Sequence, residues 1–255
     1  MRSTLDAELT CDAFLGGRLS IWQPRKGYRA GVDPVLLAAA TPAQAGQSVL
    51  ELGCGVGVAS FCLGARVSGL SLTGIEIQPD YADLARRNAS ENGVDINIIN
   101  ADLRALPMDV KQAQFDHVIA NPPYFLRDKG ISADNPGRET ALGGDTPLTD
   151  WINMAARRLA PKGVFTMIQR IDRLPEAMSA LHGRLGSAVL QPLAARQDRA
   201  AHLFLLQARK GGRADFRLNF PLVVHRGPQH LTDGDDYSED FSDIFRHGKS
   251  LPLND

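Results

Sequence analysis

The sequence predicts a single α/β domain with a mostly parallel, seven-stranded sheet and helices on both of its faces. From Ser48 onward, short apolar runs alternate with stretches of helical periodicity, which is the pattern of β-α-β units. A pair of closing strands follows after Ala188. The 255 residues allow one large domain or two small ones, and the composition, 44% hydrophobic and 22% charged, is that of an ordinary globular protein. This composition excludes collagen-like, disordered and disulfide-scaffold proteins.

Seven short apolar segments are the candidate strands of this sheet. They are Ser48–Leu52, Ser71–Ile77, Ile96–Ala101, Phe115–Ala120, Val164–Ile168, Ala188–Leu193 and Leu203–Gln207. In sheets of this kind, ligands bind at the carboxyl ends of the strands.

Helical periods fill the gaps between these strands. One helix is expected to run from the glycine-rich turn at 53–57 to about Arg66, and another from Pro79 to Asn92, with Gly93 as its stop. A third has an apolar face over 148–159 that includes Trp151, so we expect this tryptophan to lie in the core. We expect Gly163 to end that helix and a fourth helix to cover about 174–185.

The formal net charge of −1 is a cancellation between segments of opposite sign. Residues 1–155 hold 13 basic and 18 acidic side chains, residues 156–217 hold 12 and 4, and residues 218–255 hold 3 and 7. The middle segment therefore carries +8, which can create a positive field on one face of a nearly neutral molecule. Net charge does not exclude a nucleic-acid partner, although solvated helix and loop faces explain the same residues equally well.

A glycine-rich turn follows the first strand, and an acid precedes it. Glu51, Gly53, Gly55 and Gly57 form an E-x-G-x-G-x-G pattern, whereas a dinucleotide-binding turn has the form G-x-G-x-x-G. Glycines let backbone N–H groups approach a ligand closely. An acid at this place disfavours a pyrophosphate and favours a ligand with an ammonium or sulfonium group.

Polar residues also follow the next three strands. Glu76 ends the second strand, where a carboxylate can accept both ribose hydroxyl protons. Asp102 follows the third strand, where an acid can accept from an adenine amino group, and Asn121 follows the fourth. The four strand ends therefore present Gly, Glu, Asp and Asn to one crevice.

On these motifs, residues 48–170 resemble the class I S-adenosylmethionine-dependent methyltransferases, a Rossmann-like fold. The resemblance implies S-adenosyl-L-methionine as cofactor, with Gly53, Gly55 and Gly57 along its methionine part. It also implies that Glu76 holds the ribose and that Asp102 and Leu103 frame the adenine. Cys54 stands where the family accepts small residues and is expected to serve packing.

The tetrapeptide Asn121-Pro122-Pro123-Tyr124 suits transfer to a planar amino nitrogen, which is a poor nucleophile. The Asn121 side-chain oxygen and the Pro122 carbonyl can accept both N–H groups and so orient the amine for attack. Two prolines stiffen the turn, and Tyr124 can stack on a flipped-out base. Adenine N6, cytosine N4, guanine N2 and the glutamine side-chain amide all remain possible acceptors.

The whole chain resembles the bacterial tRNA adenine-N6 methyltransferases that modify a valine tRNA. The resemblance rests on the NPPY motif, the segment from Gly27 to Leu37, and a tail around Pro221–His225. It implies that Asp33 contacts the cofactor and Asn121 adjoins it, and that adenine N6 in tRNA is the methyl acceptor. Val32 departs from the pattern, because a hydroxyl residue is expected there. Methyltransferases with other acceptors also carry the NPPY motif. The alternatives are therefore a protein glutamine or rRNA guanine methyltransferase, or a non-catalytic RNA-binding module of the same fold.

Three segments follow from this resemblance. Residues 1–47 form an N-terminal extension that caps the cofactor site, residues 48–210 the catalytic domain, and residues 211–255 a C-terminal extension whose acidic tail, from Thr232, is expected to be lightly packed. We expect four residues to contact the substrate, namely Pro123, Phe125, Arg127 and Arg29.

Other site types receive no support from the sequence. The three cysteines and six histidines lack metal-ligand spacing, so no metal is expected. No segment approaches the roughly 20 apolar residues of a membrane span, and an acid-containing N-terminus does not resemble a signal peptide. We therefore expect a cytoplasmic protein with tRNA as its partner and no membrane association.

Overall fold

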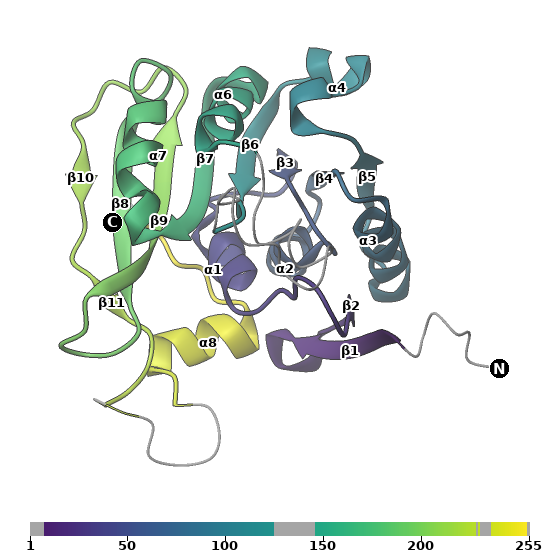
Figure 1. The fold of residues 1–255 in the computed structure, drawn as a ribbon, viewed down its shortest axis with the longest axis horizontal. Coiled ribbons are helices and arrows are strands. Elements are labelled where there is room, and N and C mark those ends of the chain that lie inside the picture. The colour runs from purple at the N-terminus through teal and green to yellow at the C-terminus, as the bar shows by residue number, and fades with distance from the viewer. Residues whose placement is uncertain (1–7, 125–145, 228, 230–235, 254–255) are drawn as a thin grey trace, which may run out of the picture.

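The computed structural model describes residues 8–124, 146–227, 229 and 236–253. Within this part of the chain, a large sheet runs through the molecule with helices on both faces, and a separate hairpin lies beside it (Figure 1). The hairpin consists of β1 (Leu9–Phe14) and β2 (Leu19–Pro24), joined by the short helix η2 (Leu15–Gly17).

The large sheet contains all seven expected strands. They are β3 (Ser48–Leu52), β4 (Ser71–Glu76), β5 (Ile96–Asn100), β6 (Phe115–Ala120), β7 (Leu159–Arg170), β8 (Gly186–Ala194) and β9 (Ala201–Arg209). Their order across the sheet is β8-β9-β7-β6-β3-β4-β5, and β9 runs antiparallel to both of its neighbours. Two short strands from the C-terminal extension, β10 (Arg217–Leu218) and β11 (Leu222–Val223), pair with β8, so the described sheet has nine strands.

The helices lie in two layers. The long ones are α1 (Asp33–Ala40), α2 (Val58–Arg66), α3 (Pro79–Asn92), α6 (Leu148–Arg158), α7 (Leu174–Leu181) and α8 (Glu239–His247); the short ones are α4 (Met108–Gln112), η3 (Leu103–Ala105) and η4 (Ile171–Arg173). As expected, α3 begins at Pro79 and stops at Gly93, whose φ of 63° is left-handed. Trp151 is buried in the core, also as expected.

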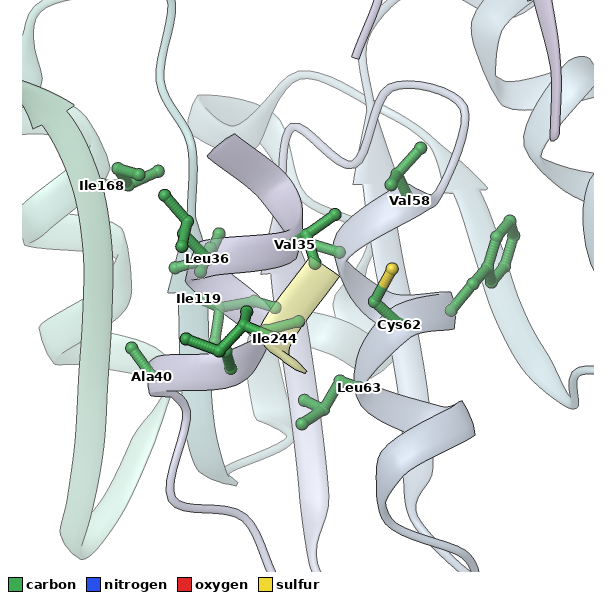
Figure 2. Close-up of a cluster of buried hydrophobic side chains, with 14 of the residues drawn as sticks. Val35, Leu36, Ala40, Val58, Cys62, Leu63, Ile119, Ile168 and Ile244 are labelled. Atoms are coloured by element: carbon green, nitrogen blue, oxygen red, sulfur yellow. The ribbon is translucent and has the colours of Figure 1, made fainter. Parts of the chain in front are cut away.

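Side-chain alternation along the central strands divides the core into two halves. In β3, Val49 belongs to the cluster that contains α1 and α2, whereas Leu50 belongs to the cluster that contains α6 and α7. In β6, Ile119 and Val118 divide in the same way. Figure 2 shows the first cluster, in which α1, α2, the sheet and Ile244 of α8 meet. Parallel strands buried on both faces read as continuous apolar runs, which is how the sequence revealed them.

The helix expected over 148–159 ends earlier than predicted. It stops at Arg158, and Leu159 already begins β7, so Gly163 lies inside the strand. The reason is Pro161, since a residue before proline disfavours the helical region and proline itself has no N–H to donate.

The expectation of a lightly packed acidic tail is wrong for α8. Phe241 and Ile244 are 3% and 1% exposed and pack against α1 and η2 as part of the first core cluster. The apolar residues recur at helical spacing, so the acids lie on the outer face while the inner face is buried. Net charge of a segment does not report this periodicity.

The packing of α8 yields a stability prediction. Ile244→Ala is expected to lower the free energy of unfolding by about 2–5 kcal/mol, because it removes a fully buried side chain and leaves a cavity. The exposed variant Glu239→Ala on the same helix is expected to change it by no more than about 0.5 kcal/mol. Urea denaturation followed by circular dichroism measures both, and equal values for the two variants would contradict the buried position of Ile244.

Candidate functional site

The predicted site residues follow four strands that are neighbours in the sheet. The order β6-β3-β4-β5 brings the ends of these strands to one edge, where Asn121, Gly53, Glu76 and Asp102 occur at or directly after them. The strand order, which no sequence pattern gives directly, therefore brings the four predicted strand ends to one edge of the sheet.

Each of the three positions in the turn requires a glycine for a different physical reason. All have positive φ values, 65°, 56° and 95° for Gly53, Gly55 and Gly57. A Cβ at Gly53 would lie 2.5 Å from Cη2 of Trp151, and one at Gly57 would collide with the ring of Phe61. Only Gly55 faces open space, with the Tyr28 ring as its nearest neighbour at 4.0 Å. Gly53 and Gly57 thus serve packing, and Gly55 is the glycine that leaves room for a ligand.

The carboxylate of Glu76 is bound to the turn itself. It accepts hydrogen bonds from the backbone N–H of Gly55 at 2.8 Å and of Gln78 at 2.8 Å. The Asn100 amide donates to the carbonyls of Glu76 and Ile77 at 2.8 and 3.0 Å, which holds the end of β4 against β5. Burial raises the pKa of Glu76, while these backbone donors oppose the rise.

Glu51 is slightly more buried than Glu76, with 3% of its surface exposed against 5% for Glu76. Its carboxylate accepts from the backbone N–H of Ser60 at 3.0 Å and from the Ser60 hydroxyl, both within α2. Burial raises the pKa of Glu51 to about 8, although the Ser60 bonds act against this rise. The group is therefore poised to hold a proton when no cation lies nearby.

Asp102 is engaged with a partner from its own loop. The Arg104 guanidinium donates to both carboxylate oxygens, at 2.7 to 3.1 Å, and the Arg104 N–H donates to Oδ1 at 2.8 Å. These bonds hold the pKa of Asp102 below its ordinary value. Leu103, which was expected to frame an adenine with it, is 7% exposed and packs into the second core cluster. An amino group that binds Asp102 has to share this carboxylate with Arg104.

The NPPY turn is held by residues of the N-terminal extension. The Asn121 amide nitrogen donates to the Tyr28 hydroxyl at 3.4 Å, and the Tyr124 hydroxyl donates to the Asp33 carboxylate. Burial and the nearby Asp33 raise the pKa of Tyr124, so its hydroxyl stays protonated and can donate. With its nitrogen bound to Tyr28, the Asn121 amide presents its oxygen as an acceptor.

Sequence reasoning missed Tyr28, which lies among three acids. Burial and the carboxylates of Asp33 and Glu51 raise the pKa of Tyr28, and Glu76 adds to the rise. Its backbone carbonyl also accepts from Tyr81. Tyr28 lies in the segment from Gly27 to Leu37 that carries the resemblance, but the sequence suggests roles there only for Arg29 and Asp33. Nothing local in the sequence indicates that Tyr28 contacts Asn121.

The carboxylates beside the glycine turn suit a positively charged cofactor. Three carboxylates, those of Asp33, Glu51 and Glu76, act on the same tyrosine beside the open glycine, and two of them are less than 6% exposed. Buried acids are costly unless a donor or a cation compensates them.

Among the described residues no group of three or more His, Cys, Asp or Glu could hold a metal ion, and no helix is long and apolar enough to cross a membrane.

The expected substrate contacts divide into three groups. Pro123 lies in the NPPY turn, and its carbonyl accepts from Gln169 and Arg173, each at 3.4 Å. Arg29 is bound within the hairpin region, to Asp12 at 2.6 Å and Thr10 at 2.5 Å. Phe125 and Arg127 lie outside the described residues.

Much of the basic segment 156–217 is used to hold the fold together. Arg158 donates to the carbonyls of Val110 and Ala113, and Arg196 is paired with Asp236. Further basic side chains that form intramolecular hydrogen bonds or ion pairs are Arg170, Arg173, Arg184, Arg209, Lys210 and Arg217. The positive surplus is therefore only partly free to attract a polyanion.

Known proteins resemble this chain over most of the described fold. A family model described as methyltransferase small domain matches residues 31–188. A Bacteroides fragilis protein named tRNA1(Val) (adenine(37)-N6)-methyltransferase is 27% identical over 158 residues, covering 61% of this chain and 65% of that protein. A Shewanella halifaxensis protein of the same name is 33% identical over 167 residues, covering 63% and 67%. The match thus spans about two thirds of the length of these relatives.

Solved structures show the same fold. An Agrobacterium tumefaciens protein described as a predicted O-methyltransferase has a TM-score of 0.69 at 24% identity, covering 88% of this chain and all of that one. A Thermus thermophilus 16S rRNA N2 G1207 methyltransferase, solved with AdoMet and guanosine, has a TM-score of 0.55 at 20% identity, covering 79% and 50%.

These findings confirm the predicted class I methyltransferase fold and S-adenosylmethionine as the cofactor. The strand order, the glycine turn and the acids beside it agree with both. The chain belongs to the methyltransferase small domain family.

Proposed function

We propose that this protein is an S-adenosylmethionine-dependent N-methyltransferase that acts on the exocyclic N6 of an adenine in tRNA. The observation that carries the proposal is the Asn121 amide, which lies one strand away from the glycine turn and whose nitrogen is bound to Tyr28. An oriented amide oxygen beside the cofactor site is what a planar amino group needs in order to be held by its N–H groups. The names of the relatives from Bacteroides fragilis and Shewanella halifaxensis support tRNA adenine as the acceptor.

When bound, S-adenosylmethionine supplies a sulfonium-activated methyl group, which the amino nitrogen accepts as it releases a proton. The chain's own residues bind and orient. Gly55 leaves room at the turn, Glu76 is placed to accept from ribose hydroxyls, and Glu51 adds a buried carboxylate that favours a cation. Asp102 and Leu103 lie at the next strand end, where an adenine ring of the cofactor fits.

The acceptor side of the reaction belongs to the NPPY turn. The Asn121 side-chain oxygen and the Pro122 carbonyl accept the two N–H groups of the amine, which directs the nitrogen toward the methyl group. Tyr124, whose hydroxyl is anchored on Asp33, offers its ring face to the base. No side chain is required as a strong base, because the nitrogen becomes positively charged as it accepts the methyl group, and this acidic cation releases one proton to water.

We propose that three segments of the chain have separate roles at this site. Residues 1–47 cap the site through Tyr28 and Asp33, residues 48–210 carry the cofactor and amine positions, and residues 211–255 add β10, β11 and α8 to the scaffold. We further propose a cytoplasmic location with tRNA as the partner, and contacts to substrate from Pro123, Phe125, Arg127 and Arg29.

The proposed function is tested by methylation of bulk tRNA. The full chain, S-adenosylmethionine and tRNA from cells that lack this gene are expected to yield N6-methyladenosine, identified by nucleoside mass spectrometry. Asn121→Ala is expected to lower kcat about 100-fold or more, because one of the two amine acceptors is lost. Methylation of a glutamine peptide or of guanine in rRNA instead would contradict the acceptor, and an unchanged rate in Asn121→Ala would contradict the role of the amide.

The open side of Gly55 yields a matched pair of variants. Gly55→Ala and Gly93→Ala both place alanine at a left-handed φ, 56° and 63°, and neither new Cβ meets an atom closer than 4.0 Å. Both are therefore expected to cost about 1 kcal/mol of stability. Only Gly55→Ala is expected to weaken S-adenosylmethionine binding, by about tenfold or more, in isothermal titration calorimetry. Equal affinity in the two variants would refute the placement of the cofactor against Gly55.

The buried Glu51 carboxyl yields a pH prediction. Its pKa of about 8 in the folded chain exceeds the ordinary 4.5, so the folded state holds an extra proton and loses stability as the pH rises between these values. The amide in Glu51→Gln still accepts from Ser60 but does not titrate. The difference in the free energy of unfolding, variant minus wild type, is therefore expected to increase from pH 6 to pH 8, by at most about 1.4 kcal/mol per pH unit, in urea denaturation at each pH. A difference that does not depend on pH would contradict this origin.

A further inference from the structure

Gln169 is a buried polar side chain beside the NPPY turn. It lies near the carboxyl end of β7 and is 0% exposed. Its Nε2 donates to the carbonyl oxygen of Pro122 at 3.1 Å and to that of Pro123 at 3.4 Å. Its Oε1 accepts from the backbone N–H of Arg170 at 2.8 Å. Both ends of the amide are thus bound, and the donor end is directed at the two prolines.

Gln169 supplies this donor beyond the end of the β6–β7 ladder. β6 ends at Ala120, which is paired with Met167, whereas β7 continues to Arg170 and remains paired with β9 on its other edge. The Pro122 carbonyl therefore lies past the last β6–β7 pair and accepts from the Gln169 side chain instead. Without this side chain, the buried Pro122 carbonyl would lose that donor.

We propose that Gln169 is a positioning residue for methyl transfer, which fixes the direction of the Pro122 carbonyl toward the amino group of the substrate. This role rests on the proposed function. A carbonyl oxygen has two lone pairs, so it can accept from Gln169 and from the amine together. Tyr28 holds the Asn121 amide and Gln169 holds the Pro122 carbonyl, so each of the two acceptors has its own support. The rate of transfer depends on this placement, because a misplacement of about 1 Å can cost about 100-fold.

Gln169→Met tests the role by removing the donor while keeping most of the volume. We expect kcat to fall about 10- to 100-fold, with KM for tRNA and the dissociation constant of S-adenosylmethionine within about twofold of wild type. The matched control is Gln191→Met. Gln191 is also a buried strand glutamine, 4% exposed, and donates to the carbonyls of Phe220 and Pro192 at 2.7 and 3.1 Å, on β8. Gln191→Met is expected to lose stability without a loss of kcat.

Gln169→Glu adds a signature that a purely structural role does not give. A protonated glutamic acid can donate to the Pro122 carbonyl, whereas the carboxylate repels both proline carbonyls. The ratio of its kcat to that of wild type is therefore expected to rise as the pH falls from 8.5 to 6. The ratio for Gln169→Met is expected to stay constant over the same range. Melting curves at each pH correct for any unfolded fraction.

The hydrogen bond itself has a readout that needs no activity. Pro122-Pro123 is the single Pro-Pro pair in the sequence. In the full chain labelled with [1-¹³C,¹⁵N]proline, only the Pro122 carbonyl carbon is bonded to a labelled nitrogen, so its NMR signal is unique. This signal is expected to move upfield in Gln169→Met, as the carbonyl loses its donor, and to stay in place in Gln191→Met.

The outcomes separate the role of Gln169 from the proposed function. A moved carbonyl signal with a lowered kcat and an unchanged KM supports the role. An unmoved signal, or wild-type kcat in Gln169→Met, overturns the role while methylation by the wild-type chain upholds the function. A wild-type chain that methylates neither tRNA nor a glutamine peptide refutes the function and the role together, even where the signal moves.

Discussion

The hydrogen bond from the Gly55 N–H to the Glu76 carboxylate is the interaction on which the site depends. It joins the turn after β3 to the end of β4 and so fixes the turn above the edge of the sheet. The absence of a Cβ at Gly53 and Gly57 lets Trp151 and Phe61 pack closely against the same turn. Helices α6 and α2, which cover opposite faces of the sheet, therefore both contact the turn at residues 53–57. A substitution in this turn is expected to disturb both halves of the core.

Two buried acids lie at this turn, and neutral groups bind them. Glu51 and Glu76 are 3% and 5% exposed, and they accept hydrogen bonds from backbone N–H groups and from the Ser60 hydroxyl. Neutral donors compensate a buried carboxylate only in part, which explains why burial raises the pKa of both groups. A positively charged ligand completes the compensation. Buried carboxylates at this turn therefore favour a cationic ligand over an anionic one.

The two ends of the described chain secure the site from outside the central sheet. Tyr28 and Asp33 reach the NPPY turn, and α8 packs on α1 directly after Asp33. Arg18 donates to the carbonyls of Ala65 and His247, which ties the hairpin region to α2 and α8. Gln169 supports the same turn from within the sheet. The NPPY turn is therefore held by contacts from parts of the chain that are far apart in sequence.

The strands, most helices and the four strand-end motifs can be predicted from the sequence, because apolar periodicity and glycine spacing are local properties. The resemblance that these motifs carry implies the cofactor, and the NPPY motif indicates a planar amine. The sequence misjudged the end of α6 and the packing of the acidic tail, where Pro161 and the buried face of α8 outweighed composition. The folded chain was needed to show that Gly55 is the open glycine of the turn, that Arg104 binds Asp102, and that Tyr28 and Gln169 contact the NPPY turn. The Tyr28 and Gln169 contacts join residues 93 and 47 positions apart, and a single buried tyrosine or glutamine leaves no periodic pattern in a sequence.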